Sequence, residues 1–299
     1  MRQASTDLRG SSSVSERLRV FWGLPLIEKY LRVALRTRRV FRKMPIPIRL
    51  SFGAWWVVEG SALDHELMTN GFETAETQFV QRFLRPGMTV LDLGAHHGLY
   101  TLLASKLVGR KGRVIAFEPS PKERKRLAKH IWLNGADNVR VEGYAVGAES
   151  GEADLFLADG ANDWCNSLRR PAESTGQTVR VQVRRLDDVV SQLELSRLDF
   201  IKMDVEGAEL DALRGAAGIL GDAARPVVLA EVYDIRTSPW GYAAREIVRF
   251  LSALNYRWFA LREDGTLEPV SAEQSSYDAN LVAVPSERQD ELPTLGKQE

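Results

Sequence analysis

The sequence predicts an α/β fold with a doubly wound, mostly parallel sheet, and three observations lead to that prediction. Short β-branched and apolar segments alternate with helical segments from residue 89 to residue 254. A glycine-containing turn at 94–98 follows the first strand of this alternation and precedes a helix. An acidic residue, Glu118, ends the next strand. Such alternation requires crossover helices, which cover both faces of a parallel sheet.

The expected elements follow the chain in order. Two short strands, 48–52 and 55–58, come first, and a helix then starts at Glu73 and is closed by Pro86-Gly87. The alternating strands are expected over 89–93, 113–117, 139–146, 200–203 and 227–231. The helices among them are expected over 100–108, 122–133, 208–220 and 243–254. The last two strands, 258–261 and 280–284, are joined without a helical pattern, so we expect an antiparallel pair with one member at the edge.

The segment between Gly147 and Asp199 interrupts this alternation. Residues 153–157 and 178–183 alternate apolar and polar side chains, which predicts two added strands. The polar loop between them, 159–177, is long, and long loops in compact domains are often functional. We therefore expect an inserted two-strand element with a long loop.

Composition and charge divide the chain into three parts. The chain has 299 residues, of which 44% are hydrophobic, enough for a sizeable buried core. Residues 1–50 contain twelve Lys and Arg against three Asp and Glu. We expect a basic N-terminal extension over 1–48, partly disordered and partly helical, a folded domain over 49–285, and a disordered tail over 286–299.

The basic extension has two interpretations. We favour a helix packed on the domain, because Pro25 breaks the apolar stripe, and peripheral contact with an anionic membrane surface is the alternative. The sequence has neither eighteen consecutive apolar residues nor a secretory signal, and Cys165 is its sole cysteine, so we expect a cytoplasmic protein. The four histidines and Cys165 show no zinc-ligand spacing, and no residue is assigned to a metal site.

The strongest local signal is Asp-Leu-Gly-Ala-His-His-Gly at 92–98. Glycine allows a sharp turn and the close approach of a ligand. A dinucleotide-binding turn has a second glycine two positions after the first, but here Ala95 and His96 follow Gly94. The spacing therefore favours a nucleoside ligand without a pyrophosphate over the dinucleotide of a nicotinamide-dependent oxidoreductase.

Acidic residues stand at the ends of three expected strands. Glu118 follows Gly94 by 24 residues, where a carboxylate can accept hydrogen bonds from ribose hydroxyls. Asp204 and Glu206 lie in the turn after 200–203, and Glu231 ends the next strand. Open α/β sheets bind ligands at the carboxyl ends of their strands, so these acids are candidate functional groups.

Several blocks of the sequence together resemble the FkbM family of S-adenosylmethionine-dependent methyltransferases. The blocks are 92–98, 116–119, 134–135, 185–188, 202–209, 213–216 and 230–231. The resemblance covers roughly residues 71–262, and Asp-Val-Glu-Gly-Ala-Glu at 204–209 is among its most specific parts. Members usually carry Asn-x-Gly after the Gly-Ala pair, where this chain has His96-His97-Gly98.

The resemblance implies a Rossmann-like methyltransferase sheet, S-adenosyl-L-methionine as cofactor, and O-methylation of a small-molecule or glycan acceptor, such as a sugar or secondary metabolite. A nucleic-acid acceptor is not expected, because the basic charge lies outside the domain and no base-flipping Pro-Pro motif occurs. An alcohol needs a base to remove its proton. Asp204 is the first candidate for that base, or for holding an activating divalent ion, and the reserves are Glu206, Glu231, His96 and His97.

The site expected from the resemblance has a part that binds the cofactor and a part that binds the acceptor. The expected cofactor contacts are Asp92, Gly94, Ala95, His96, His97, Gly98, Tyr100, Glu118, Pro119, Tyr144, Ala145, Val146 and Asp204. The residues expected around the acceptor are Asn162, Trp164, Asn166 and Trp240. Two alternatives remain open, a non-catalytic S-adenosylmethionine-binding protein and a nicotinamide-dependent oxidoreductase.

Overall fold

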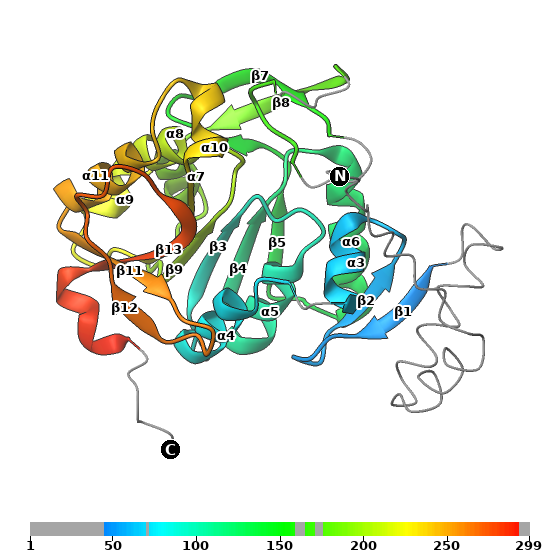
Figure 1. The fold of residues 1–299 in the computed structure, drawn as a ribbon. Helices are drawn as coiled ribbons and strands as arrows, with labels where there is room; N and C mark the ends of the chain where they lie inside the picture. The colour runs from blue at the N-terminus through cyan, green and yellow to red at the C-terminus, as the bar shows by residue number, and fades with distance from the viewer. Residues whose placement is uncertain (1–44, 70–71, 159–164, 171–175, 293–299) are drawn as a thin grey trace, which may run out of the picture. The chain divides into compact units, whose positions relative to one another are not determined.

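The computed structural model describes residues 45–69, 72–158, 165–170 and 176–292 (Figure 1). The chain divides into two compact units, Met1–Ile46 and Pro47–Glu299. The basic extension predicted for 1–48 thus lies almost wholly outside the described residues. Within the described ranges, every helix is too short or too polar to cross a bilayer.

An eight-stranded sheet organises the described part of the larger unit (Figure 1). Its strands in spatial order are β12 (Leu267–Pro269), β11 (Tyr256–Leu261), β13 (Asp278–Pro285), β10 (Val227–Tyr233), β9 (Phe200–Met203), β3 (Thr89–Leu93), β4 (Arg113–Phe117) and β5 (Val139–Glu142). The strands from β10 to β5 run parallel, whereas β13 runs antiparallel to both β10 and β11. The doubly wound, mostly parallel sheet and the antiparallel pairing of the last two predicted strands are confirmed.

The edge of the sheet differs from the prediction. An antiparallel strand does occupy it, but that strand is β12, which pairs with β11. Neither of the two predicted strands lies at the edge, and β13 lies inside the sheet. β12 has three residues and ends at Pro269, so it is too short to produce a recognisable alternation.

Helices cover both faces because successive strand residues point to opposite sides of a sheet. Val90 belongs to a core with α4 (Thr74–Phe83) and α5 (Leu99–Val108), and Ala116 packs with α6 (Pro121–Asn134). Leu91 and Leu93 belong to the core that contains the helices of the other face. Those helices are α7 (Leu186–Gln192), α8 (Glu209–Arg214) and α11 (Arg245–Ala253).

The strand predicted over 139–146 is wrong in its second half. It ends at Glu142, and Ala145–Val146 form a separate strand, β6, that pairs with β8 (Thr178–Arg184). A second sheet of order β6-β8-β7 results, with β7 at Gly151–Phe156. The predicted two-strand insertion, β7 and β8, is confirmed.

The helix predicted over 208–220 is also divided, into α8 and α9 (Ala217–Gly221). The Gly215 carbonyl accepts a hydrogen bond from the Asp187 N–H (2.9 Å) at the start of α7. A Cβ at Gly215 would lie 2.0 Å from the Gly147 carbonyl oxygen. This close contact with the inserted segment ends the helix, and only glycine fits there.

Elements outside the family resemblance complete the fold at both ends. A two-stranded sheet of β1 (Ile46–Arg49) and β2 (Trp55–Val58) precedes a helix that the sequence did not predict, α3 (Ala62–Thr69). The prediction of a disordered tail from 286 is wrong over Ser286–Glu291, which form the 3-10 helix η3. Arg288 holds this helix by donating to the carbonyl oxygen of Asp199 (3.2 Å).

Candidate functional site

A pocket lies at the carboxyl ends of β3, β4, β9 and β10, the edge at which open α/β sheets bind ligands. It is lined by most of the residues predicted for the site: Asp92, Gly94, Ala95, His96, Tyr100, Glu118, Pro119, Tyr144, Ala145, Val146, Asn166, Asp204, Glu206 and Glu231. It is also lined by residues for which no role was predicted, among them Leu63, Glu73, Lys202 and Arg236.

Three residues predicted to contact ligand, His97, Gly98 and Trp240, do not line the pocket. A Cβ at Gly98 would lie 2.5 Å from Leu127, so this glycine faces α6. Trp240 lies against the back of the turn after β9, where its Nε1 donates to the Glu206 carbonyl oxygen (3.2 Å). The predicted acceptor residues Asn162 and Trp164 lie outside the described residues.

The turn after β3 is held against the turn after β9. Gly94 has a φ of 80°, and a Cβ there would lie 1.8 Å from the Asp204 carbonyl oxygen. The N–H groups of Gly94 and Ala95 both donate to the Phe117 carbonyl oxygen, at 3.1 and 2.9 Å. These contacts fix the ends of β3, β4 and β9 relative to one another and require glycine at position 94.

Glu118 ends β4 with a buried carboxyl group. Its Oε2 accepts from the His96 N–H (2.7 Å) and its Oε1 from the Ser120 N–H (2.8 Å). Burial raises the pKa of Glu118 to about 7, against the opposing effect of these two donors. Each oxygen retains a lone pair, so the group can accept two further hydrogen bonds.

Lys202 brings positive charge to the floor of the pocket. Its Nζ donates to Asp204 Oδ2 (2.7 Å) and lies 4.9 Å from the centre of the Tyr100 ring. Burial tends to lower the pKa of Lys202, but the carboxylates of Asp204, Asp92 and Glu73 outweigh it and shift the pKa upward. Lys202 therefore stays protonated at neutral pH.

Two further carboxyl groups, those of Asp92 and Glu73, lie in the same region of the pocket. Asp92 Oδ2 accepts from the Thr101 hydroxyl (2.5 Å), but its buried Oδ1 has no partner among the described residues. Glu73 Oε2 accepts from the Tyr100 hydroxyl (2.5 Å), and burial raises the pKa of Glu73 to about 7. Glu73 precedes every predicted motif, so no sequence signal identified it.

Glu206 and Glu231 face each other across Arg236. Arg236 Nη1 lies 3.3 Å from Glu206 Oε2, and its Nε lies 3.7 Å from Glu231 Oε1. Glu231 Oε2 is buried and has no partner within the described residues. Burial, followed by the negative charge of Asp204, raises the pKa of Glu206 to about 8 and that of Glu231 to about 10. The region therefore has more carboxyl groups than its cations can neutralise.

The turn that carries Glu206 is strained and tightly supported. Glu206 has a φ of 56°, in the left-handed region that residues other than glycine rarely adopt. Its carbonyl oxygen accepts from the Ser167 hydroxyl (2.8 Å), and Glu209 Oε1 accepts from the Val205 N–H (3.0 Å). Glu209 thus supports the backbone beneath the pocket, and such strain is often found at functional sites.

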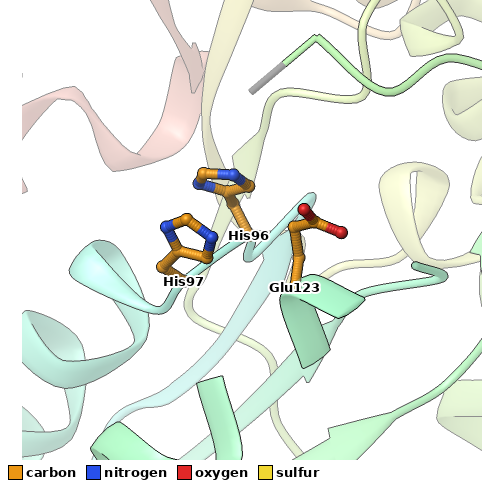
Figure 2. A group of neighbouring side chains, drawn as sticks. All are labelled: His96, His97 and Glu123. Atoms are coloured by element: carbon orange, nitrogen blue, oxygen red, sulfur yellow. The ribbon is translucent and has the colours of Figure 1, made fainter. Parts of the chain in front are cut away.

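His96, His97 and Glu123 form the one group of three candidate metal ligands found in the described ranges, with ligand atoms within 4.8 Å of one another (Figure 2). The two imidazoles stack with their centres 3.6 Å apart. Arg126 Nη1 lies 3.2 Å from His97 Nδ1, and because a guanidinium only donates, Nδ1 must accept and Nε2 must carry the proton. A metal ion bound at Nε2 would need the opposite tautomer.

The charge around these histidines also disfavours a cation. Arg126 and Lys122 lie beside these residues, while burial lowers the pKa of His96 to about 4 and, with His96 and Arg126, lowers the pKa of His97, so both imidazoles are neutral at pH 7. Lys122 Nζ lies 3.2 Å from Glu123 Oε1. His97 is instead a structural link, whose carbonyl oxygen accepts from His130 Nδ1 (2.8 Å).

Comparison with known proteins gives a family for the chain. Residues 92–258 match the sequence profile described as "Methyltransferase FkbM domain". The chain is 31% identical over 222 residues to the AMB antimetabolite synthetase AmbE of Pseudomonas aeruginosa, an alignment that covers 62% of this chain and 10% of AmbE. It is 31% identical over 151 residues to the 2-O-methyltransferase NoeI of Sinorhizobium fredii, covering 46% of this chain and 61% of NoeI. The alignments thus span a tenth and about three-fifths of these two relatives.

Two solved structures are similar to the chain at low identity. The methyltransferase FkbM from Methylobacillus flagellatus aligns with 19% identity and a TM-score of 0.42, over 74% of this chain and 52% of that one. An O-methyltransferase from Bacillus cereus in complex with SAH aligns with 16% identity and a TM-score of 0.43, over 75% and 86%.

Proposed function

The chain belongs to the FkbM methyltransferase family, and from this premise we propose that it transfers a methyl group from S-adenosyl-L-methionine to a hydroxyl oxygen. The acceptor in this proposal is a small molecule or glycan, such as a sugar or a secondary metabolite. The name of the relative NoeI, a 2-O-methyltransferase, supports oxygen as the methylated atom.

The charge of the pocket carries this proposal. Six carboxyl groups line it against two cationic side chains: Glu73, Asp92, Glu118, Asp204, Glu206 and Glu231, with Lys202 and Arg236. S-adenosylmethionine carries a sulfonium and an ammonium against one carboxylate, and its positive charge would favour the ionised form of these carboxyl groups, so the cofactor suits this environment. The two phosphates of a nicotinamide dinucleotide would be repelled, and His96 occupies the position of the second turn glycine. Charge therefore favours the methyltransferase over the oxidoreductase.

The residues of the pocket fit the parts of this cofactor. We assign the ribose to Glu118, whose oxygens retain lone pairs, and the adenine edge to Tyr144, Ala145 and Val146. The place of a Cβ at Gly94 is taken by the Asp204 carbonyl oxygen, so this glycine lets the two turns that border the cofactor meet. When bound, the cofactor supplies an electrophilic methyl carbon on its sulfonium, and holding an acceptor oxygen beside that carbon is worth about 7–11 kcal/mol in favourable cases.

We assign removal of the acceptor proton to Asp204. Lys202 holds its Oδ2, and the side chain remains partly exposed to the pocket. Glu206 and Glu231, with pKa values raised to about 8 and 10, hold protons at neutral pH. They are therefore suited to donate hydrogen bonds to the acceptor, and Arg236 keeps them in place. A positioned base typically contributes about 10²–10⁴ in rate.

Geometry favours this proton-transfer role of Asp204 over a role in metal binding. The three-ligand cluster that occurs within the described residues is made of His96, His97 and Glu123 and does not include Asp204. Lys202 already places a positive charge 2.7 Å from Asp204 Oδ2.

Two measurements test the proposal. S-adenosylhomocysteine should raise the melting temperature of the protein, whereas NAD should not, and the reverse result would favour the oxidoreductase. Extracts of metabolites and glycans incubated with labelled S-adenosylmethionine and the enzyme should then yield labelled products. Binding of the cofactor without any labelled product, across extracts and simple polyols, would favour the non-catalytic alternative.

A further inference from the structure

Glu73 enters the pocket from a part of the chain that precedes the family match, which begins at residue 92. It lies just before α4 with a φ of 45°, in the left-handed region that residues other than glycine rarely adopt. Its side chain makes no capping hydrogen bond to the helix that follows it. The carboxylate instead accepts from the Tyr100 hydroxyl (2.5 Å) at the pocket. A strained backbone that directs a charged group into a cavity suggests a ligand contact.

The carboxyl groups around Glu73 outnumber the cations beside them. Lys202, the ammonium at this end of the pocket, is shared by the carboxyl groups of Glu73, Asp92 and Asp204. Asp92 Oδ1 is buried without a partner among the described residues, although buried carboxylates are normally hydrogen-bonded. A second ammonium group in this place would supply both the missing donor and the missing charge.

The strand order places this cluster away from the nucleoside end. Glu118 and Tyr144 follow β4 and β5, whereas Lys202 lies on β9 and Asp92 on β3. Since β9, β3, β4 and β5 are consecutive in the sheet, the carboxyl cluster lies on the β9 side of the ribose position. A ligand with a nucleoside at one end and an amino acid at the other would bring its ammonium group to the cluster.

We propose that Glu73, together with Asp92, binds the ammonium group at the amino-acid end of the cofactor; this assignment rests on the function proposed above. The segment before the family match would then form part of the cofactor site.

Two ligands that differ in the amino-acid end test this assignment. S-adenosylhomocysteine carries the ammonium group, and 5′-methylthioadenosine has the same nucleoside without it. In the full chain, Glu73→Gln should weaken S-adenosylhomocysteine binding by about 10- to 100-fold, measured by calorimetry, because a hydrogen bond between charged groups is lost. The affinity for 5′-methylthioadenosine should stay within a factor of about two, well below the tenfold that corresponds to 1.4 kcal/mol.

Glu76→Gln is the matched control. Glu76 lies on the same helix but accepts from Asn280 Nδ2 (2.9 Å) and does not line the pocket, so its variant should bind both ligands as the parent does. Tyr100→Phe removes the hydroxyl that holds Glu73 and should weaken only S-adenosylhomocysteine, by less than Glu73→Gln does. Equal losses for both ligands in Glu73→Gln, or no loss for either, would overturn the assignment. Absence of binding of either ligand to the parent protein would instead overturn the proposed function.

Discussion

Two buried polar clusters meet at the turn after β3, and they differ in where their hydrogen-bonding partners come from. His97 contacts the Asp64 cluster, made of Trp56, Asp64, Arg126 and His130, whereas the neighbouring His96 lines the acidic pocket. Asp64 accepts five hydrogen bonds, from Trp56 Nε1, Arg126 Nη2 and the N–H groups of Glu59, Gly60 and Ser61. Burial alone would raise the pKa of Asp64. The positive charge of Arg126 and these hydrogen-bond donors outweigh burial, and the pKa of Asp64 lies below its usual value.

The acidic pocket shows the opposite condition. Asp92 Oδ1 and Glu231 Oε2 are buried without partners among the described residues, and burial raises the pKa of both groups. A cluster whose donors all come from the protein stabilises the fold, while one that lacks donors and cations is suited to bind a cationic ligand. The comparison separates structural from functional polar groups, and four predictions test it.

The largest effect should come from Asp204→Asn. If Asp204 is the base, the rate of methyl transfer should fall by about 10²–10⁴-fold, because the amide cannot take the acceptor proton. The side chain keeps its size, so calorimetry should find S-adenosylhomocysteine binding nearly unchanged. Full activity in this variant would move the proton acceptor to another group.

The next effect is on stability and concerns the Asp64 cluster. Arg126→Met leaves the Asp64 carboxylate buried without its cation and should lower the free energy of unfolding in urea by about 3–5 kcal/mol. Glu231→Gln is the comparison variant from the acidic pocket. It removes a carboxyl group that burial penalises, so the free energy of unfolding should stay equal or rise. A similar loss in both variants would contradict the distinction between the clusters.

The two clusters should also respond to pH in opposite directions. Glu118 and Glu206 have native pKa values raised from 4.5 to about 7 and 8, so the folded state binds their protons more tightly than the unfolded state does. Stability of the ligand-free protein should therefore fall as pH rises from about 5 to 8. Asp64, with a lowered pKa, contributes stability that is fully present above its ordinary pKa of 3.8 and is lost as pH falls from there through the lowered native pKa.

Thermal melts across this pH range measure the effect. In Glu206→Gln the melting temperature should fall less steeply above pH 5, since one carboxyl group with a raised pKa is removed. A melting temperature that rises steadily from pH 5 to 8 in the ligand-free protein would contradict the raised pKa values.

The sequence predicted the parallel sheet because β3 and β4 are short apolar runs that each precede a helix of ten or more residues, and β9 is a short apolar run that precedes a turn with glycine. It failed where elements were short. α7 has seven residues and β12 has three, so neither repeats a pattern often enough to be recognised. Gly215 looks like an ordinary helix residue in the sequence, and its contact with Gly147 is visible only in three dimensions.

The site residues that the sequence could locate were those at the ends of predicted strands. Strand ends located Glu118, Asp204, Glu206 and Glu231, because topology alone brings the carboxyl ends of parallel strands together. Glu73 could not be located this way, since it enters the pocket from the residue before α4 rather than from the end of a strand. The two adjacent histidines could not be distinguished by sequence either, because Arg126, which holds His97, comes from α6.

The smallest expected effect concerns that histidine pair. The ligand atoms of His96, His97 and Glu123 are close enough for a metal ion (Figure 2). Arg126, however, fixes the proton of His97 on Nε2 through its contact with Nδ1. Zn²⁺ should therefore leave the melting temperature of the parent protein unchanged. In Arg126→Met, Nδ1 is free to carry the proton, Nε2 can bind a metal, and Zn²⁺ should raise the melting temperature of this weakened variant. A zinc response in the parent that His96→Ala abolishes would show that the cluster binds metal despite Arg126, and the distinction between a structural and a ligand-binding side of the turn would then be wrong.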